Sequence, residues 1–96
     1  MAIGVTAKLR VQDGKNEEFE ALFKQLQDAV NANEEGCNFY ALHQSRSDAQ
    51  SYMVLEQYAN EEALALHGKT EYFGRIGALM GGCMAGAPEI ELFDSV

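Results

Sequence analysis

Hydrophobic and polar residues alternate along the first eleven positions of the chain. Ile3, Val5, Ala7, Leu9 and Val11 are separated by glycine, threonine, lysine and arginine. A period of two predicts a strand with one apolar face. The strand should end at the Asp-Gly dipeptide that follows, because this dipeptide is a turn signal.

The spacing of apolar residues then changes to three and four. They recur at Phe19, Leu22, Phe23, Leu26 and Val30, with glutamate and glutamine among the residues between them. This pattern predicts an amphipathic helix from about Asn16 to about Asn33. Asn16 is expected to cap the start of the helix, and Gly36 is expected to end it with a left-handed backbone.

Residues 37–58 predict a β-hairpin whose two faces are both apolar. Val54 and Tyr58 point one way, whereas Met53 and Leu55 point the other. A sheet that is apolar on both faces must be covered on both. One layer of helices covers one face, so we expect a second copy of the chain to cover the other.

Two short helices and a final strand complete the predicted order. Asn60 and Thr70 are expected to be helix N-caps, and Gly68 is expected to end the first of these helices near His67. The alternating stretch 89–96 predicts the last strand. The order β-α-β-β-α-β in one domain, residues 1–96, predicts an α+β, ferredoxin-like fold with an antiparallel sheet and its helices on one face.

Net charge narrows the class of partner. The chain has 15 acidic and 7 basic residues, a formal net charge of −8, and the basic residues are scattered. Nucleic acids and anionic membranes would be repelled, so the expected partner is a small neutral or apolar molecule. No uncharged run is long enough to span a bilayer and the N-terminus does not resemble a signal peptide, so we expect a soluble cytoplasmic protein.

The sequence contains no pattern typical of a metal or cofactor site. It has no dinucleotide fingerprint, no Walker loop and no close spacing of His, Cys and carboxylate ligands, so we expect no bound metal, flavin or nicotinamide. Cys37 and Cys83 form no disulfide framework. Two free thiols and a single bridge are both compatible with the sequence.

His67 is the strongest candidate for chemistry. In a helix that begins after Asn60 it shares a face with Ala63 and Leu64, so its side chain should point inward. The helix C-terminus favours the protonated imidazole, whereas burial disfavours it. Glu56 is the expected partner, because a carboxylate among aromatic neighbours should be paired, hydrogen-bonded or protonated. Alternatively, the two side chains only join the sheet to the helix.

Three segments together resemble the antibiotic biosynthesis monooxygenase (ABM) domain family. They read EEGCNFYALHQS, SYMVLEQYANEEALALHGKTEYF and APEIELFD. The positions that follow the family order and spacing are Gly36, Cys37, Tyr40, Glu56, Tyr58, Ala63, Leu64, His67, Tyr72 and Phe73. The resemblance implies a ferredoxin-like fold and a homodimer. In this homodimer the sheets of the two chains pack face to face and form a dimeric α/β barrel.

Enzymes of this family oxidise aromatic polyketides or quinols with molecular oxygen, without a metal or flavin. The resemblance therefore implies a cofactor-independent monooxygenase of a small phenolic, quinol or polyketide-like substrate. His67 and Glu56 take the catalytic positions, with His67 as a base oriented by Glu56. The expected substrate-binding residues are Tyr52, Tyr58, Tyr72, Phe73 and Thr6, although the aromatic residues among them are also compatible with core or interface packing.

Several positions differ from parts of the family. The chain has no tryptophan, and Tyr58 stands where many members have one. Haem-degrading relatives have Asn, Trp and a haem-ligating His at about the places of Thr6, His67 and Gly77, so the resemblance does not imply haem degradation. Two alternatives are a non-catalytic dimeric protein that binds an apolar ligand, and an isomerase of a small phosphorylated signal metabolite.

Overall fold

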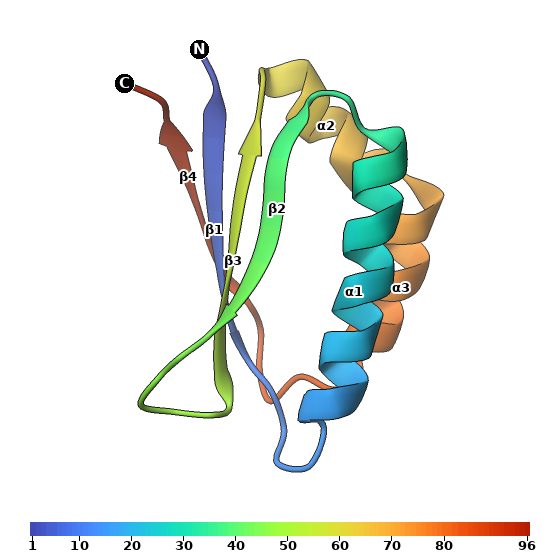
Figure 1. Ribbon diagram of the computed structural model, residues 1–96, viewed down its shortest axis with the longest axis vertical. Coiled ribbons are helices and arrows are strands. Elements are labelled where there is room, and N and C mark those ends of the chain that lie inside the picture. The colour runs from blue at the N-terminus through green and yellow to red at the C-terminus, as the bar shows by residue number, and fades with distance from the viewer.

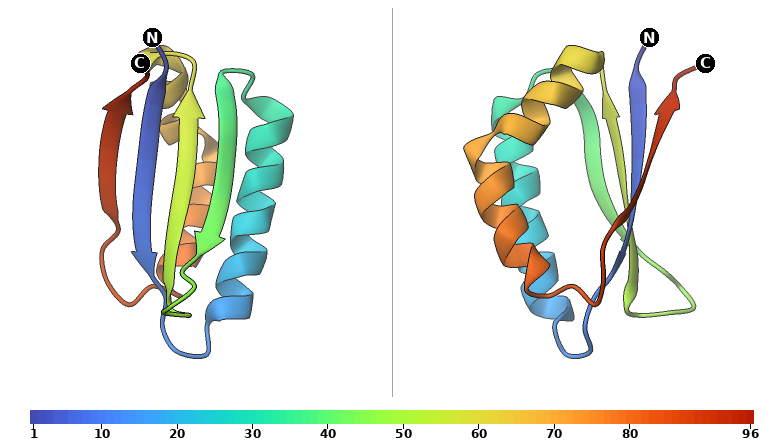
Figure 2. Two further views of the ribbon diagram at one scale, coloured as in Figure 1. Left: turned by 60° about the vertical axis from the view of Figure 1, so that its left-hand side comes forward. Right: turned by 180° about the vertical axis from the view of Figure 1, so that it is seen from behind.

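The computed structural model of the protein describes residues 1–96, which form one sheet covered by helices on a single face (Figures 1 and 2). The strands are β1 (Ile3–Arg10), β2 (Cys37–Gln44), β3 (Ser51–Tyr58) and β4 (Glu89–Asp94), and the helices are α1 (Asn16–Asn33), α2 (Glu61–Lys69) and α3 (Glu71–Gly81). All neighbouring strands are antiparallel, in the order β2-β3-β1-β4. The predicted ferredoxin-like order is confirmed. The sheet is open, and one chain alone does not close a barrel.

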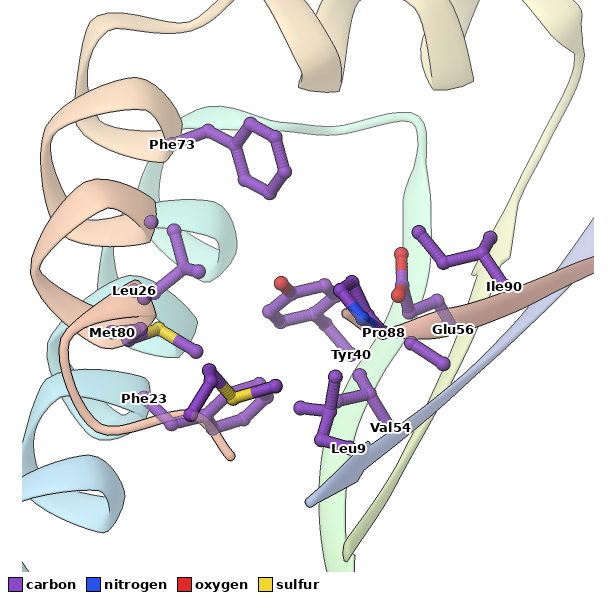
Figure 3. A pocket seen from close by; sticks show the side chains of 14 residues that line it. Leu9, Phe23, Leu26, Tyr40, Val54, Glu56, Phe73, Met80, Pro88 and Ile90 are labelled. Atoms are coloured by element: carbon purple, nitrogen blue, oxygen red, sulfur yellow. The ribbon is translucent and has the colours of Figure 1, made fainter. Parts of the chain in front are cut away.

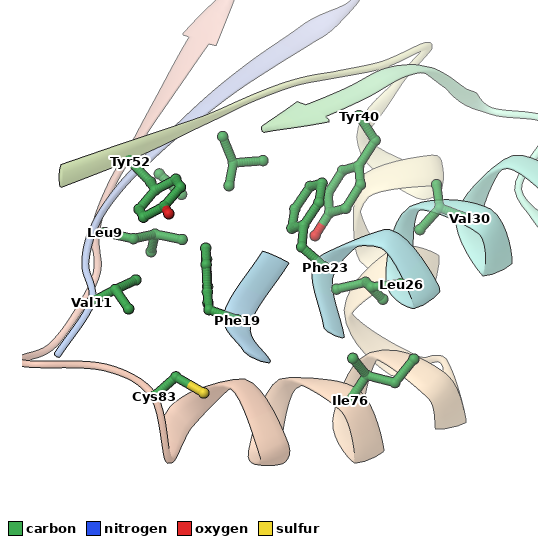
Figure 4. Close-up of a cluster of buried hydrophobic side chains, with 12 residues drawn as sticks. Leu9, Val11, Phe19, Phe23, Leu26, Val30, Tyr40, Tyr52, Ile76 and Cys83 are labelled. Carbon is green, nitrogen blue, oxygen red and sulfur yellow. The ribbon is translucent and has the colours of Figure 1, made fainter. Parts of the chain in front are cut away.

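The alternation along the strands sets which side chains enter the core. On β1, Ile3, Val5, Ala7 and Leu9 face the helices and are buried. Because β3 pairs with β1 in register, its alternate residues from Tyr52 to Tyr58 face the same way. Figure 4 shows the resulting core, in which the apolar stripe of α1 packs onto the sheet and Ile76 of α3 joins the same cluster from the other side of α1; the α1 residues are Phe19, Phe23, Leu26 and Val30.

Two of the three predicted helix caps are confirmed. The Asn60 side chain accepts a hydrogen bond from the backbone of Ala63, and that of Thr70 accepts one from the backbone of Phe73. Each therefore satisfies a helix N–H group that has no partner within its own helix. None of the three helices combines the length and the apolar character that crossing a bilayer requires.

The prediction that Asn16 caps α1 is wrong. Lys15 occupies the cap position and makes no side-chain cap hydrogen bond. The Asn16 amide instead donates to the Ala49 carbonyl and to the Tyr52 hydroxyl, each at 2.9 Å. The Asn16 side chain therefore binds residues of the β2–β3 loop and of β3, and not the end of its own helix as the local sequence predicts.

The prediction that Gly36 ends α1 with a left-handed backbone is also wrong, and Gly68 does not end α2. Gly14, in the Asp-Gly turn, is the glycine with positive φ, at 82°. Gly68 lies inside α2, which continues to Lys69. Gly36 is needed for close packing, because a Cβ added there would lie 2.6 Å from the Cβ of Ala63 on α2.

The outer face of the sheet is partly apolar and has no covering layer within the chain. Phe39, Leu55 and Phe93 lie on this face and are 47%, 37% and 45% exposed. Ile90 and Leu92 lie on the face that the helices cover elsewhere, yet both remain exposed because the helices do not extend over β4.

Candidate functional site

A pocket of about 240 Å³ lies between the sheet and helices α1 and α3 (Figure 3). Ten of its fourteen lining residues are hydrophobic. The fourteen residues come from all four strands, from α1 and α3 and from the segment between α3 and β4, and are Ala7, Leu9, Phe23, Leu26, Tyr40, Val54, Glu56, Phe73, Gly77, Met80, Gly81, Met84, Pro88 and Ile90. An apolar pocket with a few polar groups is the usual form of a small-molecule site.

Glu56 is the one carboxylate in the pocket wall. The alternation of β3 turns it toward the helices, between Val54 and Tyr58, and it is only 9% exposed. The Tyr58 hydroxyl donates a hydrogen bond to its Oε1 at 2.7 Å. Burial raises the pKa of Glu56 above its usual range, the Tyr58 hydrogen bond opposes the shift and the charge of Glu34 adds to it. A carboxylate of this kind is a stronger base than one in water.

His67 faces inward, as its helical position predicts, but its partner is Glu34 and not Glu56. Its Nδ1 lies 3.0 Å from Oε1 of Glu34 and 3.2 Å from Oε2, and both side chains are buried. Tyr72 donates a hydrogen bond to the same carboxylate. Because an ionised carboxylate only accepts, Nδ1 carries the proton and Nε2 is left as an acceptor. The polar cluster formed by Glu34, His67 and Tyr72 joins the C-terminal end of α1 to α2 and α3.

Three aromatic rings surround the imidazole beside the pocket. The centroid of its ring lies 4.6 Å from that of Phe73, 5.2 Å from Tyr58 and 5.3 Å from Tyr40. Burial lowers the pKa of His67, and the Glu34 carboxylate opposes this shift without reversing it. The imidazole is therefore neutral at pH 7. It stands behind the wall that Phe73 and Tyr40 form, at the Glu56 end of the pocket.

The structure divides the predicted binding residues into three groups. Phe73 lines the pocket. Tyr58 and Tyr72 do not line the pocket, but their hydroxyls donate hydrogen bonds to the buried carboxylates of Glu56 and Glu34. Tyr52 and Thr6 do not line it: Tyr52 is a core residue that donates to Glu20, and Thr6 points to the outer face of the sheet because the strand alternates.

Comparison with known proteins assigns the family. The family model described as antibiotic biosynthesis monooxygenase matches residues 2–78. The chain belongs to the antibiotic biosynthesis monooxygenase family. The resemblance found in the sequence is thereby confirmed. Among curated proteins, none matches the chain.

Solved structures of similar proteins support this assignment. A protein from Caulobacter crescentus, named as a candidate antibiotic biosynthesis monooxygenase, is 50% identical, with a TM-score of 0.96 over 99% of this chain and 90% of that one. A conserved protein from Methanosarcina mazei is 31% identical, with a TM-score of 0.90 over 97% and 91% of the two chains. A candidate ABM protein from Nitrosomonas europaea is 17% identical with a TM-score of 0.94 over 99% and 90%, which shows a shared fold alone.

Two residues of this ABM-family site were not assigned a role from the sequence. Glu34 stands in a segment that indicates only the end of a helix, and 33 positions separate it from His67. No periodic pattern connects residues so far apart. Tyr40 belongs to the matched segments, but only the strand register, which pairs it with Glu56, shows that it faces the pocket.

The cysteines of this ABM domain are not activated thiols. Cys37 and Cys83 are both free. Burial, with the nearby charges of Glu34 and Glu56, raises the pKa of Cys37 to about 11, so its thiol is protonated at pH 7. Burial, with the hydrogen bond that Cys83 donates to Glu18, likewise raises the pKa of Cys83. No group of three or more His, Cys, Asp and Glu side chains is arranged to hold a metal ion.

Proposed function

We propose that the protein is a cofactor-independent monooxygenase that oxidises a small phenolic, quinol or polyketide-like aromatic with molecular oxygen. The observation that carries the proposal is the position of Glu56, a buried carboxylate of raised pKa in the wall of an otherwise apolar pocket. Such a group is suited to remove a proton from a weakly acidic hydroxyl. Membership of the ABM family supports the reaction class.

The reaction begins with proton transfer from the substrate hydroxyl to Glu56. The resulting phenolate passes one electron to O2, which gives a phenoxyl radical and superoxide. The two radicals combine into a carbon–oxygen bond, and protonated Glu56 returns its proton to the peroxide. The carbon that carries the hydroperoxide then loses its hydrogen as a proton while the O–O bond breaks, so water leaves and a carbonyl group remains. One oxygen atom of O2 thus enters the product and the other enters water. The apolar lining excludes bulk water from these charged intermediates.

Glu56 and His67 both remain in the proposed mechanism, with their expected roles changed: Glu56 is the catalytic base and His67 is a positioning residue. The base that contacts the substrate is Glu56, because it lines the pocket and His67 does not. His67 is held by Glu34 and packs on Phe73 and Tyr58, so it fixes the end of the pocket at which Glu56 works.

The protein is further proposed to act as a homodimer. Phe39, Leu55 and Phe93 leave an apolar surface on the outer face of the sheet, and a second copy of that face supplies an apolar surface to cover it. Two open sheets packed in this way would give the dimeric arrangement that the family resemblance implies.

The pocket favours this proposal over isomerisation of a phosphorylated metabolite. None of its lining residues is lysine, arginine or histidine, and its charged member is Glu56. A phosphate group would be repelled there rather than bound. A non-catalytic binding protein would use the same pocket, so it differs from the proposed enzyme only in leaving its ligand unchanged.

Oxygen consumption tests the proposal. Metal- and flavin-free protein is mixed with a panel of phenols and hydroquinones that includes 1-naphthol, in an oxygen electrode, beside its Glu56→Gln and His67→Ala variants. We expect the unaltered protein to consume oxygen with at least one compound, and we expect this uptake to be slower with both variants. Uptake no greater than that of Glu56→Gln throughout the panel would contradict the proposal. Conversion that continues under nitrogen would indicate an isomerase instead.

A further inference from the structure

Two glycines form part of the pocket wall that α3 contributes, beside Phe73 and Met80. Gly77 and Gly81 lie one helical turn apart and both line the pocket, with Phe73 before them and Met84 after them. A Cβ added at either glycine would meet no heavy atom within 4 Å. Glycine in a helix interior is destabilising relative to alanine, and at Gly77 no close contact requires it. The missing side chains leave a hollow along the helix backbone.

Tyr40 presents a polar group without a protein partner to this hollow. Its side chain enters from β2 on the strand face that it shares with Glu56, and its ring stacks on Phe23, with centroids 5.1 Å apart and planes at 9°. The residue as a whole is 6% exposed, but its hydroxyl is not fully enclosed, because every fully buried polar side-chain atom of the protein has a hydrogen-bond partner and this hydroxyl has none. Figure 3 shows that the hydroxyl points away from the sheet into the pocket. The hydroxyl is therefore open to the pocket and free to donate a hydrogen bond to a ligand atom.

We propose that the pocket binds a flat aromatic ligand of one or two rings, which lies against the α3 backbone at Gly77 and Gly81 and accepts a hydrogen bond from Tyr40 through an oxygen atom. The volume of about 240 Å³ is below the usual range for drug-sized ligands and limits the number of rings. The space beside the two glycines limits how thick the ligand can be, and the Tyr40 hydroxyl determines where the ligand's oxygen atom lies. The aromatic class of the ligand rests on the proposed function.

Coumarin and naphthalene form a matched pair of probes for Tyr40. Both are flat and bicyclic, but only coumarin has a carbonyl oxygen, and coumarin has no hydroxyl through which the proposed oxidation could begin. Calorimetric titration of the Tyr40→Phe variant should show coumarin binding weakened roughly 3- to 10-fold, the effect of one lost hydrogen bond, with naphthalene binding unchanged. Circular dichroism establishes that the variant is folded.

Gly77→Leu and Gly74→Leu form a matched pair of variants for the hollow. Gly74 lies on the same helix, is exposed, does not line the pocket and likewise has room for a Cβ. Both substitutions favour the helix, so both should keep or raise the melting temperature. Only Gly77→Leu should weaken coumarin and naphthalene binding, by about 10-fold or more, since its side chain fills the hollow.

Three results would overturn the inference. They are equal losses of coumarin and naphthalene binding in Tyr40→Phe, equal coumarin affinity of Gly77→Leu and Gly74→Leu, and absence of saturable coumarin binding to the unaltered protein. Because this test measures binding without turnover, its result is separate from that of the oxygen-uptake test of the proposed function.

Discussion

At the scale of single residues, hydrogen bonding distinguishes two buried carboxylates. Glu34 accepts bonds from both His67 and Tyr72, so its oxygens are occupied by the protein itself. Glu56 accepts one bond, from Tyr58, and also faces the pocket. Glu34 is therefore suited to hold three helices together, and Glu56 is suited to exchange a proton with a ligand.

The activity of Glu56 should depend on pH in a way that its raised pKa predicts. The proposed base works only when it is deprotonated, so oxygen uptake should rise with pH through a value above 4.5, the ordinary pKa of a glutamate. Glu56→Gln should lose roughly 100-fold or more of the rate across the range. If the substitution left the pH profile of oxygen uptake unchanged, a residue other than Glu56 would be the base.

The same residue should affect stability in the opposite direction. The folded protein holds the Glu56 proton more tightly than the unfolded chain does, so this stabilising contribution is full below 4.5 and is lost as pH rises through the raised pKa. Glutamine keeps an acceptor for the Tyr58 hydroxyl and does not ionise. Thermal melts should therefore show Glu56→Gln gaining stability over the unaltered protein as pH increases. A constant difference at all pH values would argue against a buried, titrating Glu56.

Removing Glu34 should destabilise the fold. Glu34→Ala leaves the buried Nδ1–H of His67 and the hydroxyl of Tyr72 without their acceptor, and an unsatisfied buried polar group is costly. Urea denaturation should show a loss of about 2 kcal/mol or more. The neighbouring Glu35 is exposed, so Glu35→Ala should change stability by no more than about 0.5 kcal/mol. Equal effects of the two substitutions would show that the cluster contributes nothing.

At the scale of elements, the connection from α1 to β2 positions α2 and therefore His67. Gly36 approaches Ala63 so closely that no side chain fits between the two segments. The backbone carbonyl of Gly36 also accepts a hydrogen bond from the N–H of Ala59, just before α2. The close contact between Gly36 and Ala63 and the hydrogen bond between Glu34 and His67 together fix the direction of α2.

Gly36→Ala should push α2 away from the sheet. The added methyl group would lie 2.6 Å from the Cβ of Ala63, and overpacking of this kind costs about 1–3 kcal/mol. Ala63→Gly removes the opposing methyl group, so the double variant should be more stable in urea than Gly36→Ala alone. Strictly additive losses in the two single variants and the double variant would rule out this contact as the cause.

Sequence patterns predicted the elements better than they predicted their partners. The two-residue alternation of β1 and the helical caps Asn60 and Thr70 depend on near neighbours, and the structure confirms them. The cap at Asn16 failed because residues of a distant loop and strand compete for the same amide. The inward direction of His67 was likewise predictable from its helix, whereas its bond to Glu34 depends on how three helices meet.

The same limit applies to the pocket. Strand alternation predicted that Glu56 faces an apolar layer, and the structure confirms it. Family resemblance suggested Thr6 as a binding residue, but the alternation of β1 turns it to the outer face. Tyr40 faces the site because β2 pairs with β3 in one register across an irregularity near Cys37, which no single segment encodes.

At the scale of the whole molecule, the outer face of the sheet should be an interface between two copies of the chain. Sedimentation should therefore give the mass of two 10.6 kDa chains. Leu55→Lys puts a charge in the middle of this face and should shift the protein toward single chains. Leu66→Lys, at an exposed position on α2, is the matched control and should leave the mass unchanged. If the unaltered protein sedimented with the mass of a single chain, the result would contradict the proposed dimer.

The fate of labelled oxygen tests the central claim most directly. The protein is incubated with 1-naphthol under ¹⁸O2, and the product is analysed by mass spectrometry beside that of Glu56→Gln. The proposed reaction predicts a quinone that contains one ¹⁸O atom, formed with one labelled water and absent with the variant. A product without ¹⁸O, or one formed equally by Glu56→Gln, would contradict monooxygenation at this pocket.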